Sequence, residues 1–359
     1  MILNSGQRAQ QIDSLRALAV FAVIFSHTIS DADTIGDFSL REFGAYGVYL
    51  FFVISGFLIT GQLIKTKNLR EENHSGLRVP LQRFFAKRAL RLLPTCYLAL
   101  CAAWIVDLRT IRVEFPWHAL QLSNVYFGLD QAAELASPVR HLWSLSMEWQ
   151  FYLVWPFVVL LCSPRWLSAV TVGLIAFSFA SWLEVLPLPE PVVNSSIPAS
   201  LDSLGFGALL AIALDRGWPL DRLARYLWWT GLAVIMMTLP LMTDHTELGW
   251  ALAPYAHEMM NLFFALLVYR CSLGIGGRVG RFLDLRFLQY SGLISYGIYL
   301  YHPYIVSAYE GLVPRWGGSM PIDHGWRLTI AVLFLSWTAA HFSWRWLEQP
   351  VNRLRRYVS

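Results

Sequence analysis

The stretch LRALAVFAVIFSHTI, residues 15–29, decides the fold. It is an apolar run with Arg16 near its start and His27 near its end, which predicts a membrane-type helix. Eleven residues separate the two, so at about 100° and about 1.5 Å per residue both side chains lie on one helix face, roughly 16 Å apart along the axis. Ionisable residues inside a membrane helix usually face a bundle interior or a watery cavity, so this face is a candidate functional site.

Two plainer interpretations of this stretch stay open. A signal peptide would use Arg8 and Arg16 as its basic flank and residues 17–25 as its apolar core. However, no small-residue cleavage site follows, and further apolar segments come next. His27 alone would also fit a packed histidine that is hydrogen-bonded to a neighbouring carbonyl group.

The composition is that of a polytopic membrane protein. The 359 residues are 56% hydrophobic and 14% charged, with a mean hydropathy of +0.45, whereas soluble domains carry about 25% charged residues. The net charge of +4 does not suggest a nucleic-acid partner. The four cysteines have no CxxC spacing, so they are interpreted as reduced packing residues, and no metal site is expected.

Hydropathy and charge together predict an all-α bundle of about ten transmembrane helices. The segment after the first span is acidic and the segment after the second is basic, so the positive-inside rule places both termini in the cytoplasm. Residues 1–359 are expected to form one membrane domain with no soluble domain, a cytoplasmic N-terminal segment at 1–12 and a basic cytoplasmic tail at 348–359. The predicted spans are 15–29, 43–64, 92–106, 142–162, 166–183, 201–214, 226–243, 254–269, 287–309 and 326–347.

A second chemically suggestive stretch is HLWSLSMEWQFYLVWP, residues 141–156. Ser144, Glu148 and Tyr152 are spaced by four and form one helical stripe. Glu148 would lie near the outer end of its span, at the depth predicted for His27, where a carboxylate can orient an imidazole or stabilise its protonated form. The alternative is an interfacial glutamate in contact with water.

A third stretch, RFFAKRALRLLP at residues 83–94, combines basic and apolar faces. Arg83, Lys87 and Arg91 recur every four residues with Arg88 alongside, which predicts an amphipathic helix lying on the cytoplasmic membrane surface. Such a face either holds anionic lipid or binds phosphate groups, to which arginine makes bidentate contacts.

A fourth stretch, LISYGIYLYHP at residues 293–303, places a second intramembrane histidine, His302, near the outer end of the ninth span. His341 in the tenth span has no recognisable context and is interpreted as a packing residue.

Taken together, these stretches resemble the acyltransferase 3 family, the integral-membrane O-acyltransferases that modify bacterial surface sugars, nodulation factors and some macrolides. The resemblance covers nearly the whole chain and comprises six motifs in order. These are Arg16-x10-His27, GVYLFFVISGFLI at 47–59, the basic run through Arg88, Arg91 and Pro94, LWSLSMEWQFYL at 142–153, ISYGIYLYHP at 294–303 and WLEQPVN at 346–352.

The resemblance implies an acyl-CoA donor, expected to be acetyl-CoA, that binds from the cytoplasm, with no permanently bound cofactor. The acceptor hydroxyl would arrive from the other side. The residues implied to hold the anionic end of CoA are Arg16, Arg83, Lys87, Arg88 and Arg91.

The resemblance also implies that His27 acts as general base or as a transient acyl carrier, supported by Glu148. The side chains expected to contact substrate are Tyr49, Ser144, Tyr152 and His302. Two positions depart from the family pattern. Tyr49 stands where the family usually has aspartate, and Trp149 replaces the second carboxylate of a common Glu-Glu-Gln run.

The expected activity is therefore transfer of an acyl group, expected to be acetyl, to a sugar hydroxyl of a surface or lipid-linked polysaccharide. The expected location is the bacterial inner membrane, and the expected partners are the lipid bilayer, acyl-CoA and the glycan. The alternatives are acylation of a small hydroxylated natural product such as a macrolide, or a non-catalytic transporter or flippase on the same scaffold. Retention of His27, Glu148, Arg88 and Arg91 favours an enzyme, whereas the change at Tyr49 points the other way.

Overall fold

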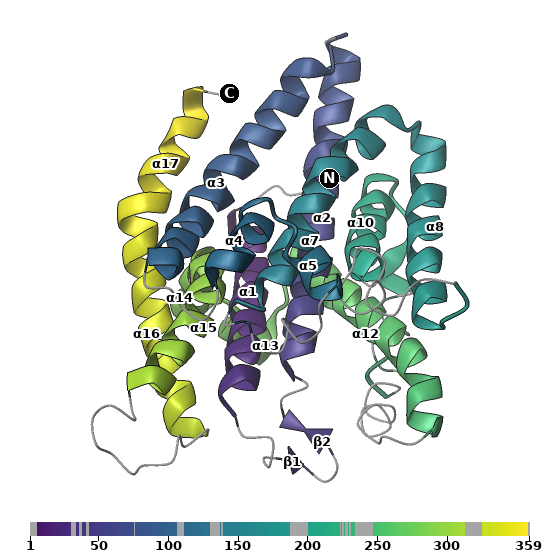
Figure 1. Cartoon of the computed structure of the whole chain (residues 1–359). Helices are drawn as coiled ribbons and strands as arrows, with labels where there is room; N and C mark the ends of the chain where they lie inside the picture. The colour runs from purple at the N-terminus through teal and green to yellow at the C-terminus, as the bar shows by residue number, and fades with distance from the viewer. Residues whose placement is uncertain are drawn as a thin grey trace.

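The computed structural model describes residues 6–29, 34–35, 38–40, 43–74, 76–105, 111–129, 137, 139–186, 200–222, 224, 226, 229, 231–233, 247–312 and 325–357. In these residues the chain is helical apart from connections and one short antiparallel hairpin, in which Thr34 pairs with Ser39 and Ile35 with Phe38 (Figure 1). The all-α prediction is confirmed for this part of the chain.

The elements follow one another as a long helical series. In chain order they are α1 (Gly6–Thr28), β1 (Thr34–Ile35), β2 (Phe38–Ser39), α2 (Phe43–Glu72), α3 (Arg78–Ile105), α4 (Ile111–Ala119), α5 (Ser123–Leu129), α7 (Leu142–Leu161), α8 (Pro164–Trp182), α10 (Leu201–Asp215), α12 (Glu247–Leu273), α13 (Gly277–Leu283), α14 (Arg286–Leu293), α15 (Ser295–Leu312), α16 (Trp326–Ser343), a π-helical turn (Trp344–Glu348), α17 (Gln349–Arg353) and a 3-10 turn (Leu354–Tyr357).

Five helices of the described chain are long and apolar enough to cross a membrane: α2, α3, α7, α8 and the part of α12 at Ala251–Leu273. Three further predicted spans, at 15–29, 201–214 and 326–347, coincide with α1, α10 and α16. Most of the seventh predicted span, 226–243, lies outside the described residues. The number of ten spans and their orientation stay predictions.

The basic segment between α2 and α3 and the basic C-terminal tail lie at one end of the bundle. Figure 1 shows the turn between α2 and α3 and the C-terminal α17 toward the top, and the β1–β2 hairpin at the opposite end. The predicted tail at 348–359 is helical as far as Tyr357 and packs against α3. The C-terminal segment is therefore part of the bundle.

The basic segment at 83–94 is not a separate surface helix, as was expected. It is continuous with the third predicted span in α3, which runs through Pro94. Phe84 is buried, with its ring centroid 6.5 Å from that of Tyr152, and Phe85 packs on Phe157 at 6.1 Å. These aromatic contacts hold the basic segment against α7, so Arg88 and Arg91 face protein while Arg83 is exposed.

The ninth predicted span, 287–309, was expected to be one helix and is two, because the chain turns at Ile294 between α14 and α15. Gly292 lies against the backbone of α1, and a Cβ at this position would come within 1.7 Å of the Asp13 carbonyl oxygen. At this position a glycine allows two backbones to come into contact, and a turn follows it. Hydropathy does not reveal such a pattern.

The start of α1 is held by residues far along the chain. Gln11 Nε2 donates to the Ile275 carbonyl oxygen at 3.0 Å and to Asp284 Oδ1 at 3.0 Å, and Gln11 Oε1 accepts from the Ile275 N–H at 2.7 Å. Ser14 Oγ donates to the Leu283 carbonyl oxygen. The helix with both predicted ionisable residues is thus anchored by the segment around α13.

Two glycines let the backbones of α2 and α10 touch. A Cβ added to Gly56 would lie 2.0 Å from the Leu204 carbonyl oxygen, and one added to Gly207 would lie 2.0 Å from the Val53 carbonyl oxygen. Small residues at helix contacts are the usual means of close packing in membrane bundles. The α2–α10 pair therefore depends on these two positions.

Gly207→Val is expected to lower the unfolding temperature of the detergent-solubilised chain, because the new side chain would overlap a backbone oxygen. Overpacking of this kind costs about 1–3 kcal/mol or more. The matched control is Gly173→Val in α8, where an added Cβ meets no atom within 4 Å. Equal losses of thermal stability in both variants would contradict the packing argument.

Candidate active site

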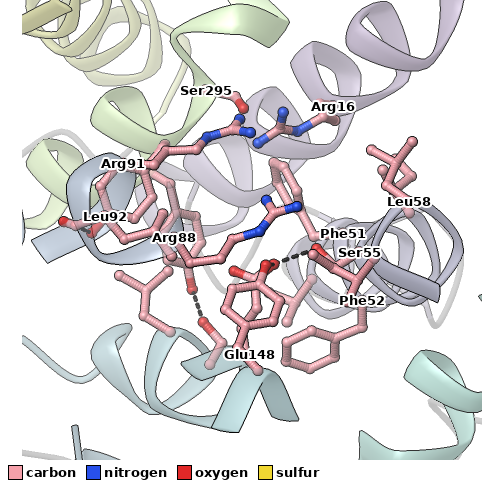
Figure 2. A pocket seen from close by; sticks show the side chains of 18 residues that line it. Arg16, Phe51, Phe52, Ser55, Leu58, Arg88, Arg91, Leu92, Glu148 and Ser295 are labelled. Atoms are coloured by element: carbon pink, nitrogen blue, oxygen red, sulfur yellow. Dashed lines mark hydrogen bonds between the residues drawn. The ribbon is translucent and has the colours of Figure 1, made fainter. Parts of the chain in front are cut away.

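An open cavity lies among α1, α2, α3, α7 and α15. Figure 2 shows its lining side chains, with arginines on one side and Glu148 and Ser55 on another. The polar residues that line it are Arg16, Ser55, Arg88, Arg91, Ser144, Glu148, Tyr152, Ser295, Tyr296 and Tyr299. The cavity thus gathers residues from both halves of the sequence.

Three arginines converge in this cavity (Figure 2). Arg88 Nη2 donates to Gln62 Oε1 at 2.8 Å, and its guanidinium lies 5.5 Å from the ring centroid of Tyr152. Arg91 is close enough to both Arg16 and Arg88 for charge repulsion. Such a group of guanidinium ions favours an anionic ligand, above all phosphate, which arginine binds bidentately.

The basic residues of α3 divide between two surfaces. Arg88 and Arg91 line the cavity, whereas Arg83 and Lys87 line a neighbouring groove with Arg70 and other residues of α2. Viewed down the helix axis, position 87 is rotated by about 40° from position 83. Position 91 is rotated by about 40° from position 87, and position 88 by about 100°. The structure therefore does not bring together the four residues of α3 that were predicted to bind the donor.

A fourth arginine, Arg355, approaches the same cluster and was not predicted to do so. It lies near Arg91 and Arg88, and its buried Nε has no hydrogen-bond partner among the described residues. Burial, with repulsion from Arg91 and Arg88, lowers the pKa of Arg355 to about 10. The sequence shows only a basic tail around Arg355. The signal that could have identified Arg355 is the density of arginines in that tail.

Glu148 lies in the cavity and not beside His27. Its Oε1 accepts hydrogen bonds from Ser55 Oγ and Tyr152 Oη, and no hydrogen bond in the described chain joins it to His27. The described hydrogen bonds of Glu148 therefore join it to Ser55 and Tyr152, and its expected support of His27 stays a prediction. The helical stripe of Ser144, Glu148 and Tyr152 does line the cavity, but its carboxylate faces the arginine side (Figure 2).

A second histidine is one hydrogen-bond partner of His27. His302 Nε2 lies 3.2 Å from His27 Nδ1, and the ring centroids are 5.0 Å apart. His302 is fully buried and its Nδ1 lies 2.6 Å from the Tyr299 carbonyl oxygen, whereas His27 is exposed. Two histidines that the sequence treats separately thus form a pair.

The histidine pair is linked to the cavity through Tyr299. The Tyr299 hydroxyl lies 2.6 Å from Ser144 Oγ, and both residues line the cavity. The same tyrosine offers its carbonyl oxygen to His302. One residue of α15 therefore connects the cavity wall to the histidines.

Tyr49 is not among the residues that line the cavity. Its ring lies edge-on to His257 with the centroids 4.4 Å apart, and His257 Nε2 lies 2.9 Å from Asp202 Oδ2. Tyr49, which was predicted to contact substrate, is thus not part of the cavity wall.

Comparison with known proteins identifies the family of the chain. The profile of a family described as an acyltransferase domain matches residues 10–341. The chain therefore belongs to this acyltransferase family, as the sequence motifs indicate.

Curated relatives extend the comparison. The chain is 29% identical over 370 residues to peptidoglycan O-acetyltransferase OatA of Listeria monocytogenes, covering 95% of this chain and 55% of the relative. It is 25% identical over 372 residues to O-acetyltransferase OatA of Staphylococcus aureus, covering 95% of this chain and 57% of the relative. The chain thus spans little more than half the length of these relatives. No solved structure matches significantly.

Proposed function

We propose that this chain is a membrane O-acetyltransferase that moves an acetyl group from acetyl-CoA to a sugar hydroxyl of a cell-wall or other surface polysaccharide. One observation carries the proposal: helix α1 contributes Arg16 to the arginine-lined cavity and also carries the accessible His27. Membership of the acyltransferase family supports the reaction class. The bacterial inner membrane is the proposed location, with the lipid bilayer as its setting.

The donor would bind with its anionic end at Arg88, Arg91 and Arg16. Guanidinium groups packed together are stabilised by phosphate, which compensates their mutual repulsion. The roughly 16 Å between Arg16 and His27 along α1 is within the reach of an extended pantetheine arm. The thioester would then lie near His27, with the arm passing Ser144 and Tyr299.

Chemistry at the thioester would proceed by general base catalysis. His27 takes the proton from the acceptor hydroxyl as the oxygen attacks the thioester carbonyl carbon. The new C–O bond forms, the C–S bond breaks, and the leaving CoA thiolate takes the proton from His27. A variant of this route has His27 carry the acetyl group transiently before the hydroxyl attacks it.

For Glu148 we propose a role in the cavity wall. Since its carboxylate accepts from Ser55 and Tyr152 within the cavity, it would order the wall along which the donor lies. The names of the relatives, which refer to peptidoglycan and to O-acetyl transfer, favour a polymer acceptor over a small natural product.

The proposal is tested by mass spectrometry of surface polysaccharides from cells with the intact gene and from cells without it. An acetyl ester that is present only with the gene, and that mild alkali removes, is the expected result. If the surface polymers are identical, the same comparison on small-molecule extracts follows. An absence of gene-dependent acetylation from both fractions would contradict the proposal and favour transport.

A further inference from the structure

Two basic residues of α3 do not reach the cavity and lie instead in a groove between α2 and α3. Arg83 and Lys87 line this groove together with Arg70, and we call it the basic groove. Neither Arg83 nor Lys87 has an ion-pair or hydrogen-bond partner in the described part of the chain. Cations that share a groove and lack partners favour an anionic ligand, and arginine in particular favours phosphate.

The protein itself supplies little negative charge to the basic groove. Among the described residues, its lining contains no aspartate or glutamate. Glu71 adjoins the groove, with its Oε1 3.9 Å from Arg70 Nη2, and the side chain of Glu71 is 51% exposed. This pair is therefore a weak surface contact, and the groove keeps a net positive charge.

Apolar side chains form a wall beside these cations. Leu63 and Phe84 line the groove and are 1% and 4% exposed, whereas Leu69, which also lines it, is 50% exposed. Figure 1 shows α2 and α3 diverging from the turn that joins them, and the groove lies between residues of these two helices. A cationic edge next to an apolar wall matches a phospholipid, whose phosphate lies next to its acyl chains.

The basic groove lies at the depth of the lipid headgroups. Residues 43–64 of α2 carry no charge, and at about 1.5 Å per residue they span roughly 33 Å, close to the thickness of the hydrocarbon core. The groove straddles the end of this stretch, because it includes both Leu63 and Arg70. On α3 the uncharged stretch begins at residue 92, beyond both basic residues that this helix contributes. Both helices thus place their groove cations where the hydrocarbon core ends.

We propose that the basic groove binds an anionic glycerophospholipid, with the phosphodiester at the basic side chains and an acyl chain along the apolar wall. Basic pockets between membrane helices hold lipid headgroups in this way. A soluble phosphate would satisfy the cations but would leave the apolar wall without a partner. The inference goes beyond the proposed function and does not depend on it. It assigns Arg83 and Lys87 to the membrane, while the donor keeps the cavity.

The test is native mass spectrometry of the full chain in detergent, titrated with phosphatidylglycerol or with zwitterionic phosphatidylethanolamine. The wild type is expected to bind phosphatidylglycerol more tightly. The double variant Arg83→Ala and Lys87→Ala is expected to bind it about 10–30-fold more weakly, because each basic residue near an anionic headgroup strengthens binding several-fold. Equal affinity of the wild type for the two lipids would overturn the inference.

Two further variants separate the groove from overall charge and from folding. Arg278→Ala with Arg281→Ala removes the same charge from α13, where both side chains are exposed and outside the basic groove, so its affinity for phosphatidylglycerol should equal that of the wild type. Arg83→Lys with Lys87→Arg keeps the charge and should keep most of the affinity. Equal weakening in both alanine double variants, or weakening in neither, would contradict a lipid site in the groove.

Competition identifies the source of the phosphate. The chain loaded with phosphatidylglycerol is mixed with glycerophosphoglycerol, which is the headgroup without acyl chains, or with CoA. Neither is expected to displace the lipid at equal concentration, because neither carries an acyl chain for the apolar wall. Displacement by the headgroup would show a site for free phosphate, and displacement by CoA would show that the groove belongs to the donor. Either result overturns the inference, and none of these measurements needs acetyl transfer.

Discussion

His27→Ala is expected to lower acetyl transfer by about 10²–10⁴-fold, the range that a positioned general base contributes. The variant keeps α1, since His27 is exposed and its loss leaves no cavity in the core. The measurement is transfer of label from radioactive acetyl-CoA to polysaccharide in isolated membranes, normalised to the amount of protein. The donor KM should change little, because the cavity arginines remain.

The matched control is His341→Ala, which removes another histidine of the bundle. His341 Nδ1 lies 2.7 Å from the Tyr290 hydroxyl, and its ring stacks on Trp337 at 5.5 Å, outside the cavity lining. Its activity per molecule should stay close to that of the wild type. Retained activity in His27→Ala, or equal losses in both variants, would show that His27 is not the base.

The double variant Arg88→Ala and Arg91→Ala is expected to raise the KM for acetyl-CoA by at least about 10–100-fold. A hydrogen bond to a charged group contributes about 1.5–3 kcal/mol, and this variant removes two guanidinium groups from the cavity. Arg355→Gln should raise the KM less, because the three cavity arginines remain. The kcat at saturating donor should fall far less than in His27→Ala.

Arg83 and Lys87 provide the control on the same helix. They line the neighbouring groove, so the double variant Arg83→Ala and Lys87→Ala removes an equal charge from α3 and leaves the cavity intact. Its donor KM should match that of the wild type. If both double variants raised the KM equally, the donor would bind to the whole basic face and not to the cavity.

Local sequence patterns predicted much of the helical fold. Apolar runs marked the positions of α2, α7 and α8, because a membrane helix needs a continuous apolar stretch. The four-residue spacing of Ser144, Glu148 and Tyr152 predicted their shared face. These features depend on neighbours within one helix, which the sequence displays directly.

Contacts between distant helices could not be predicted in this way. The pairing of His27 with His302, and of Glu148 with Ser55, depends on how α1, α2, α7 and α15 pack together. The turn at Ile294 follows Gly292, which lies against the backbone of Asp13 in a distant helix. Hydropathy carries no information on which helix faces which.

The anchoring of α1 has a consequence for how the protein is made. Gln11 bonds to residues 264 and 273 positions later in the chain, and His302 is 275 positions after His27. Helix α1 is therefore synthesised long before its partners exist. A nascent chain holds Arg16 and His27 without their anchors, so the site is assembled only after the segment through α15 has been made.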